Sequence, residues 1–351
     1  MLKPRESIAG MSPYLSPIVS RAGLSLDLNE SMAGCSPRVL ERLRSLSAED
    51  ISLYPKREVG ERLVANFLGV LPEQVLLTDG MDEALSLLFA TYLGENDELL
   101  FAEPTFVMYP MLGEALGAQL VRVRSGEDLA LPTADLLSRI SPRTRVIAVA
   151  NPNNPTGLAA SRADLLKIVE SAPGAAVLID EAYFEFCGET LLADLTRHPN
   201  LFVGRTFSKA YGLAGLRLGV LTGAAEQIDY IRRHSAPFNV NSVVLTCLEE
   251  ALADQAFVRN HVAQVKQGRE RLAQAFTELG LRFWPSRTNF VLVRVGTTAK
   301  AFVDSMQRRG ILVRDSSASP GCEGCVRMTV GTPEQMDGVL KAIREAIAET
   351  R

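Results

Sequence analysis

The sequence lacks the features that would tie the protein to a membrane or a nucleic acid. No uninterrupted apolar run approaches the roughly 20 residues that cross a bilayer, and the first residues do not resemble a signal peptide. The 37 basic and 41 acidic residues give a formal charge of -4, with no basic block for a polyanion. We therefore expect a cytoplasmic protein with no membrane or nucleic-acid partner.

Cysteine and histidine are also scarce, and their spacing does not suggest a metal site. The five cysteines are scattered from Cys35 to Cys325, unlike the disulfide framework of a small secreted domain. Cys322 and Cys325 form a C-x-x-C pair, but no second pair or neighbouring histidine completes four zinc ligands. We predict free thiols, a turn position for this pair, surface or packing roles for the three histidines, and no metal.

Residues 76–218 carry the pattern of an α/β protein. Short apolar runs alternate there with helical stretches, which is typical of a largely parallel sheet covered by helices. Chemistry in such sheets gathers at the carboxyl ends of the strands. Strands are expected at residues 98–102, 146–150, 176–179 and 201–203, and a helix begins at Ser161 and ends near Pro173.

After about residue 245 the pattern changes to that of a smaller α+β unit. A long amphipathic stretch covers 248–279, followed by strands at 289–294 and 310–314 and a closing helix at 333–348. The chain is long enough for two domains. We predict an N-terminal arm with part of a small domain at 1–50, a large domain at 51–245, and the rest of the small domain at 246–351.

Two segments combine turn residues with groups that can bind an anionic, aromatic cofactor. Thr78–Ala84 reads as a turn into a helix, where free backbone amides can cradle a phosphate, although for this segment alone an ordinary capped helix is the better interpretation. Asn151–Gly157, with the sequence Asn-Pro-Asn-Asn-Pro-Thr-Gly, follows a strand directly. Its prolines and glycine impose a rigid turn from which the Asn154 amide can donate to a phenolate oxygen.

Two further segments supply an acid and an amine. Val177–Tyr183 puts Asp180 at the end of a buried strand, where a carboxylate needs a positive partner such as a protonated pyridine nitrogen. Arg205–Arg217 brings Ser208, Lys209 and Arg217 together after the next strand. A partly dry site crowded with cations lowers the pKa of a lysine amine, so that it can attack a carbonyl. Ser208 and Arg217 can hold a phosphate.

In this order, the four segments resemble those of the class I and II aminotransferases of fold-type I, over nearly the whole chain. The likeness is strongest to the histidinol-phosphate aminotransferases. It rests on Tyr14, Leu28–Glu30, Tyr54-Pro55, Ser208–Arg217 and Gly324–Gly331. The resemblance implies a large domain with a mixed, mostly parallel sheet in three α/β/α layers, a smaller α+β domain built from both termini, and pyridoxal 5'-phosphate (PLP) as cofactor.

The resemblance also assigns the cofactor residues. Lys209 matches the Schiff-base lysine, Asp180 the partner of the pyridine nitrogen, and Asn154 with Tyr183 the groups at the phenolic oxygen. The phosphate would meet the amides of Gly80 and Met81 and the side chains of Ser208 and Arg217. Phe106 matches the aromatic residue that stacks on the cofactor ring, and Tyr54 a tyrosine that reaches the cofactor phosphate of the neighbouring subunit. A homodimer with shared active sites is therefore implied.

The substrate residues follow from the same resemblance. Arg327 matches an arginine that binds an α-carboxylate, and Tyr14 and Arg314 match positions at the phosphate-bearing end of the amino donor. Asn29 lies in the segment at the substrate mouth, where Asn29–Met32 departs from the usual Asn-Glu-Asn-Pro. The implied substrates are a small-molecule amino donor, histidinol phosphate, and a 2-oxo acid, 2-oxoglutarate.

Other functions are compatible with parts of this pattern. The same site can serve an aminotransferase for aromatic or other amino acids, or a threonine-phosphate decarboxylase. A non-catalytic protein that only binds the cofactor is disfavoured, because no DNA-binding extension is present and every chemical position is filled. A dinucleotide-binding dehydrogenase would need a G-x-G-x-x-G turn, which Gly212-Leu-Ala-Gly215 does not supply.

Overall fold

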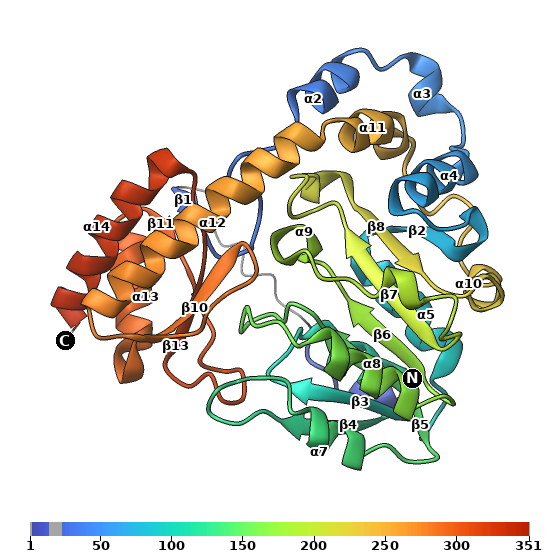
Figure 1. Cartoon of the computed structure of the whole chain (residues 1–351), viewed down its shortest axis with the longest axis horizontal. Helices are drawn as coiled ribbons and strands as arrows, with labels where there is room; N and C mark the ends of the chain where they lie inside the picture. Colours follow the sequence, from blue (N-terminus) through green and yellow to red (C-terminus); the bar gives the residue numbers. More distant parts are fainter. Residues whose placement is uncertain (1, 14–22, 351) are drawn as a thin grey trace.

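A seven-stranded mixed sheet forms the larger part of the protein, in a computed structural model that describes residues 2–13 and 23–350. The strand order is β2-β8-β7-β6-β5-β3-β4, and β8 alone runs antiparallel to both its neighbours (Figure 1). The α/β class with a mostly parallel sheet is thus confirmed. The strands are β2 (Val75–Asp79), β3 (Glu98–Glu103), β4 (Gln119–Arg124), β5 (Thr144–Ala150), β6 (Ala176–Asp180), β7 (Leu201–Thr206) and β8 (Leu218–Thr222).

Helices cover both faces of this sheet, because consecutive side chains of its buried strands point to opposite faces. Val146 and Ala148 of β5 pack in one core cluster with α5, α6 and α10, while Ile147 and Val149 pack in another with α7 and α8. The predicted three layers are therefore present. The helices are α5 (Gly80–Tyr92), α6 (Met108–Leu116), α7 (Thr133–Ser138), α8 (Arg162–Ser171) and α10 (Ala225–Arg232).

A four-stranded antiparallel sheet of order β12-β13-β10-β9 forms the centre of the smaller unit. Its strands are β9 (Arg282–Phe283), β10 (Phe290–Arg294), β12 (Arg314–Asp315) and β13 (Cys325–Thr329). The sheet packs with α13 (Ala299–Arg308), which in turn packs with α14 (Pro333–Thr350). The short strand β1 (Leu24–Ser25) pairs in parallel with β11 (Ile311–Leu312). Both ends of the chain thus contribute to this unit, as expected, while the domain boundaries at residues 50 and 245 stay a prediction.

Two elements differ from their sequence-based description. The amphipathic stretch at 248–279 is two helices, α11 (Ser242–Ala253) and α12 (Gln255–Glu278). The break falls at Asp254, whose carboxylate accepts a hydrogen bond from the Phe257 amide and so caps α12. The strand expected at 310–314 is split, since β11 pairs with β1 whereas β12 pairs with β13.

The remaining helices lie mainly around the large sheet and along α12, which runs from the large unit to the small one (Figure 1). The helix predicted at Ser161 is confirmed as α8, with the Ser161 hydroxyl accepting from the Asp164 amide. The other helices are α1 (Glu6–Ala9), α2 (Pro37–Arg44), α3 (Ala48–Ser52), α4 (Arg57–Leu68) and α9 (Phe184–Cys187), with 3-10 turns at Pro72–Gln74, Leu192–Asp194, Ala214–Leu216 and Gly296–Thr298.

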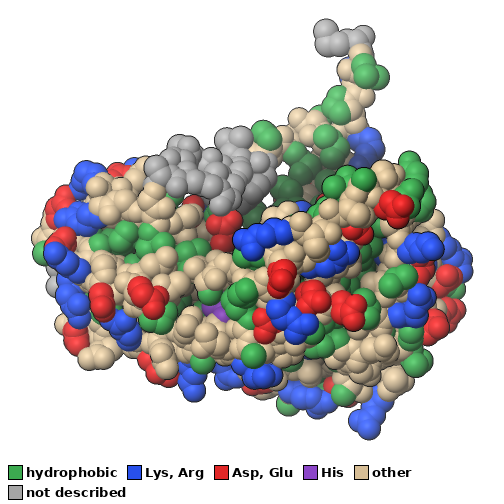
Figure 2. All heavy atoms as spheres, turned by 90° about the horizontal axis from the view of Figure 1, so that it is seen from above, with side chains coloured by type: hydrophobic (Ala, Val, Ile, Leu, Met, Phe, Trp, Pro, Cys, Tyr) green, Lys and Arg blue, Asp and Glu red, His purple; other side chains and the backbone are tan. Residues whose placement is uncertain are grey.

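The surface seen in Figure 2 carries charged side chains of both signs, and the cysteines are free thiols. Acidic and basic side chains are interspersed over the face seen in Figure 2. Within residues 2–13 and 23–350, no helix combines the length and apolar character needed to cross a membrane. All five cysteines are free, and Cys322 and Cys325 are buried on either side of the turn at 323–324.

Candidate active site

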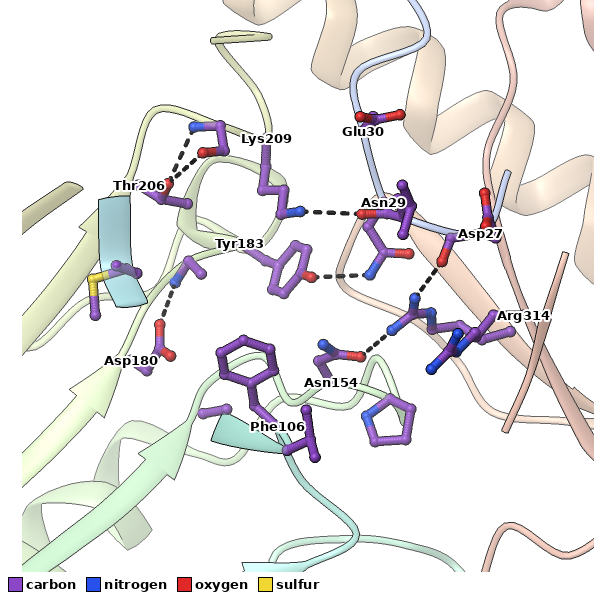
Figure 3. Close-up of a pocket in the computed structure, with 18 of the residues that line it drawn as sticks. Asp27, Asn29, Glu30, Phe106, Asn154, Asp180, Tyr183, Thr206, Lys209 and Arg314 are labelled. Atoms are coloured by element: carbon purple, nitrogen blue, oxygen red, sulfur yellow. Dashed lines mark hydrogen bonds between the residues drawn. The ribbon is translucent and has the colours of Figure 1, made fainter. Parts of the chain in front are cut away.

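A cavity of about 760 Å³ lies at the carboxyl ends of the central strands, facing the small sheet (Figure 3). Its volume is within the range of about 300–1,000 Å³ that is usual for small-molecule sites. The cavity brings together most of the residues predicted from sequence. Those that line it are Asn29, Met81, Phe106, Asn154, Asp180, Tyr183, Ser208, Lys209, Arg217, Arg314 and Arg327.

Lys209 lies in the turn after β7, with its amine directed into the cavity. Its Nζ donates a hydrogen bond to the Leu28 carbonyl at 3.3 Å. Burial lowers the pKa of Lys209 to about 8, helped by the positive charge of Arg327 and opposed by Glu30. The pKa therefore leaves a usable fraction of neutral amine near neutral pH, and only a neutral amine can attack a carbonyl carbon.

Asp180 is the last residue of β6 and is buried at the floor of the cavity. Its Oδ2 accepts a hydrogen bond from the Tyr109 hydroxyl at 2.8 Å, and its Oδ1 accepts from the Ala182 amide at 3.1 Å. Burial raises the pKa of Asp180 to about 6, against these two hydrogen bonds, which lower it. A carboxylate in this position is suited to a cationic partner such as a protonated ring nitrogen.

Tyr183 and the two asparagines lie on the opposite side of the cavity from Asp180 (Figure 3). The Tyr183 hydroxyl accepts a hydrogen bond from Asn29 Nδ2 at 3.0 Å. The Asn29 backbone is left-handed, with φ 56°, and its amide donates to Thr329 Oγ1 at 3.1 Å. Asn154 Oδ1 accepts from Arg327 Nη1 at 2.5 Å. Side-chain amide and phenol groups thus face one part of the cavity, as a phenolic oxygen of a ligand would require.

A cradle for an anion forms where β2 turns into α5. Gly80 is the first residue of the helix, with φ 75°, and Arg217 packs so closely over it that a Cβ at Gly80 would lie 2.3 Å from the guanidinium. Arg217 also pairs with Asp82 at 3.3 Å. The buried Ser208 hydroxyl lies nearby on the cavity wall and accepts from Thr206. Helix-terminal amides, a hydroxyl and an arginine are a suitable set for a phosphate group.

Phe106 supplies an apolar wall beside Asp180 (Figure 3). Its ring makes an edge contact with Tyr109, with ring centroids 5.9 Å apart. An aromatic ring stacked on Phe106 would have its edge near the Asp180 carboxylate. The buried acid, the amine, the anion cradle and this wall together fit the demands of PLP.

Arg314 and Arg327 give the cavity a cationic side on the small sheet. They face each other across the β12–β13 pair, so both side chains project from the same face of that sheet. Arg327 Nη2 donates to the Asp27 carbonyl at 2.6 Å, and its guanidinium lies 5.3 Å from the centre of the Phe290 ring. Two adjacent guanidinium groups favour an anionic substrate group such as a carboxylate or a phosphate.

Two of the predicted site residues that the structure describes do not line the cavity. Gly80 lies behind Arg217, although the next residue, Met81, is part of the wall. Tyr54 is exposed over 78% of its surface and stacks on Phe238, with ring centroids 4.3 Å apart. Tyr54 therefore makes no contact with the cavity of its own chain. The predicted residue Tyr14 lies outside the described residues.

Two residues of this site, Tyr109 and Thr206, were not predicted from the sequence. Tyr109 donates a hydrogen bond to Asp180 without lining the cavity. Its only signal in the sequence is its position three residues after Phe106, and an ordinary buried aromatic residue can have the same position. Thr206 lines the cavity and donates to Ser208. It lies in the Arg205–Lys209 segment, in which only Ser208 and Lys209 were predicted as site residues.

Comparison with known proteins identifies the family over almost the entire chain. Residues 22–343 match the aminotransferase class I and II family. The chain is 33% identical to a histidinol-phosphate aminotransferase of Dehalococcoides mccartyi over 97% of its own length and 96% of the relative's. It is 35% identical to histidinol-phosphate aminotransferase 1 of Bacillus thuringiensis, over 93% and 89% of the two chains.

The fold is likewise that of a solved aminotransferase. The crystal structure of histidinol-phosphate aminotransferase from Sinorhizobium meliloti, in complex with PLP, superposes with a TM-score of 0.92 at 24% identity, covering 100% of this chain and 99% of the other. The predicted fold-type I architecture is thus confirmed. The chain belongs to the aminotransferase class I and II family.

Proposed function

We propose that the protein is a PLP-dependent histidinol-phosphate aminotransferase of histidine biosynthesis. It would convert histidinol phosphate and 2-oxoglutarate to imidazole acetol phosphate and glutamate. The observation that carries this proposal is a single cavity that joins Lys209 and Asp180 to the paired arginines Arg314 and Arg327. The names of relatives that are 33% and 35% identical over most of the chain support this donor.

PLP would be held by the large domain. Ser208, Arg217 and the amides of Gly80 and Met81 would bind its phosphate, Phe106 would cover its ring, and Asp180 would pair with its ring nitrogen. Asn154 and Tyr183 would donate to its phenolic oxygen. When bound, PLP supplies an electron-withdrawing ring that stabilises negative charge on the substrate carbon.

Lys209 would both anchor the cofactor and move the proton. Its lowered pKa, about 8, gives it a neutral form that can accept a proton from the substrate carbon and a charged form that can return one. Asp180, ionised above about pH 6, would keep the ring nitrogen protonated. The proton transfer depends on both groups, which face the cavity from the ends of adjacent strands, β6 and β7.

Arg327 and Arg314 would alternate between the two substrates. Glutamate and 2-oxoglutarate offer carboxylates, whereas histidinol phosphate has no carboxylate and offers a phosphate. A guanidinium fork accommodates either anion. Asn29 and the predicted residue Tyr14 would complete the substrate side.

A homodimer would complete the site. Tyr54 is exposed beside further exposed apolar side chains in the same stretch of chain, Ile51, Leu53 and Val59, and beside its stacking partner Phe238. Clustered exposed apolar groups are typical of an interface. Tyr54 would then reach the cofactor phosphate of the partner subunit, and the enzyme would act in the cytoplasm.

A steady-state screen of amino donors with 2-oxoglutarate tests the proposal. Histidinol phosphate, phenylalanine, tyrosine and threonine phosphate are compared by kcat/KM, and histidinol phosphate is expected to be preferred. Preference for an unphosphorylated donor would instead indicate an aminotransferase for aromatic amino acids. Release of carbon dioxide from threonine phosphate, with 2-oxoglutarate unused, would indicate the decarboxylase.

A further inference from the structure

Tyr109 contacts Asp180 through a side-chain hydrogen bond. Its hydroxyl donates to Asp180 Oδ2 at 2.8 Å, while the Ala182 amide donates to Oδ1 at 3.1 Å. Tyr109 has no exposed surface and does not line the cavity. It therefore acts on a bound ligand only through Asp180 or through the cavity wall.

The position of the Tyr109 hydroxyl is set by the packing of its ring. The ring lies in the core cluster between α5, α6 and the sheet, with centroids 6.4 Å from Phe89 and 5.9 Å from Phe106. A side chain enclosed in this way has little rotational freedom. The hydroxyl thus fixes the position of one carboxylate oxygen. The orientation of the Asp180 side chain therefore does not depend on its own rotamer preference.

The chemistry of the contact favours one protonation state of Asp180. A phenol that donates to a carboxylate stabilises the ionised form, since the ionised form is the stronger hydrogen-bond acceptor. Burial acts in the opposite direction and raises the pKa of Asp180. The pKa of Tyr109 itself is raised well above its usual value by burial and by Asp180, so the phenol stays a donor over the working pH range.

We propose that Tyr109 is a positioning residue that keeps Asp180 ionised and directed at the ring nitrogen of the cofactor. The inference rests on the proposed function, because it needs a ligand with a protonated ring nitrogen in the cavity. The role of Tyr109 can be tested without measuring catalysis, because it predicts how tightly the cavity binds that ring.

The test compares two ligands that differ at one atom. PLP and its carbocyclic analogue, with carbon in place of the ring nitrogen, are titrated into cofactor-free wild-type protein and Tyr109→Phe, and each Kd is measured between pH 6 and 9. Tyr109→Phe is expected to weaken PLP on the order of tenfold at neutral pH, as for a lost hydrogen bond to a charged group, and to leave the analogue unchanged. The loss should shrink as pH rises, because Asp180 then ionises without help.

Tyr92→Phe is the matched control. Tyr92 lies on α5, is partly buried, and donates to Gln227 at 2.7 Å, outside the cavity. Its loss is expected to leave both Kd values unchanged. An equal loss for both ligands in Tyr109→Phe would overturn the proposal and assign Tyr109 to the support of Phe106, and no loss would overturn it as well. Failure of wild-type protein to bind PLP would instead refute the proposed function.

Discussion

The two sides of the cavity are built in different ways. The large-domain side takes its groups from the ends of adjacent strands in one sheet, with Asp180 after β6 and Lys209 after β7. The small-domain side takes Arg314 and Arg327 from the β12–β13 pair. It takes Asn29 from a segment 300 residues before Thr329, to which the Asn29 amide donates a hydrogen bond. The positions of the groups on the large-domain side therefore follow from short stretches of sequence. The positions of those on the small-domain side depend on how the two ends of the chain pack.

Removing Lys209 should give the largest effect, and it tests the large-domain side. Lys209→Ala loses both the anchor for the cofactor and the base, so turnover is expected to fall by at least about 10³-fold. Single-turnover kinetics of the purified variant would measure this, with circular dichroism as the check on folding. Full transaminase turnover in this variant would show that the assignment is wrong.

The same lysine should make stability depend on pH in the cofactor-free protein. Because its folded pKa, about 8, lies below the usual 10.5, the unfolded chain binds more protons between these values, so the free energy of unfolding rises with pH there. The gain is about 3 kcal/mol at most. Urea unfolding of wild type and Lys209→Met, compared at pH 7 and pH 10, should show the variant as the more stable at pH 7, with a smaller gap at pH 10. A constant gap would contradict the lowered pKa.

Neutralising Asp180, on the large-domain side of the cavity, should slow the chemical step more than it weakens substrate binding. Asp180→Asn keeps the shape of the side chain but cannot balance a protonated ring nitrogen. We expect kcat to fall roughly 100-fold, with a smaller change in the KM of the amino donor. The deuterium isotope effect at the substrate carbon should rise, since proton removal becomes slower. A larger change in KM than in kcat would mean that Asp180 acts mainly in binding.

Changing the paired arginines should have the smallest effects and tests the small-domain side. Arg327→Lys keeps the charge but loses the fork that contacts Asn154 and Asp27, and we expect KM for 2-oxoglutarate to rise about tenfold. Arg314→Lys should raise KM less for 2-oxoglutarate than for the phosphorylated donor. Lys300→Arg, on the exposed face of α13, is the control and should leave both KM values unchanged. If both variants raised the KM of both substrates equally, Arg314 and Arg327 would not differ in the substrate that they bind.

Much of the large-domain side could be predicted from sequence for a physical reason. A buried strand that ends in a charged residue needs a partner for that charge, so Asp180 was visible in the chain itself. Asn154 and Ser208 likewise follow buried strands, whereas Phe106 was assigned only through the family resemblance. Tyr109 could not be found, because a buried tyrosine in an apolar helix looks the same whether or not its hydroxyl meets a carboxylate.

The sequence by itself determined the family, the mostly parallel sheet and the order of the chemical groups along it, because these depend on local patterns and on motifs of a few residues. Only the tertiary structure decided which groups meet. Arg314 faces Arg327 because of the register between β12 and β13, and Asp180 is held by Tyr109 because α6 packs on the sheet. Distances between remote segments depend on packing across the whole molecule, which no local pattern records.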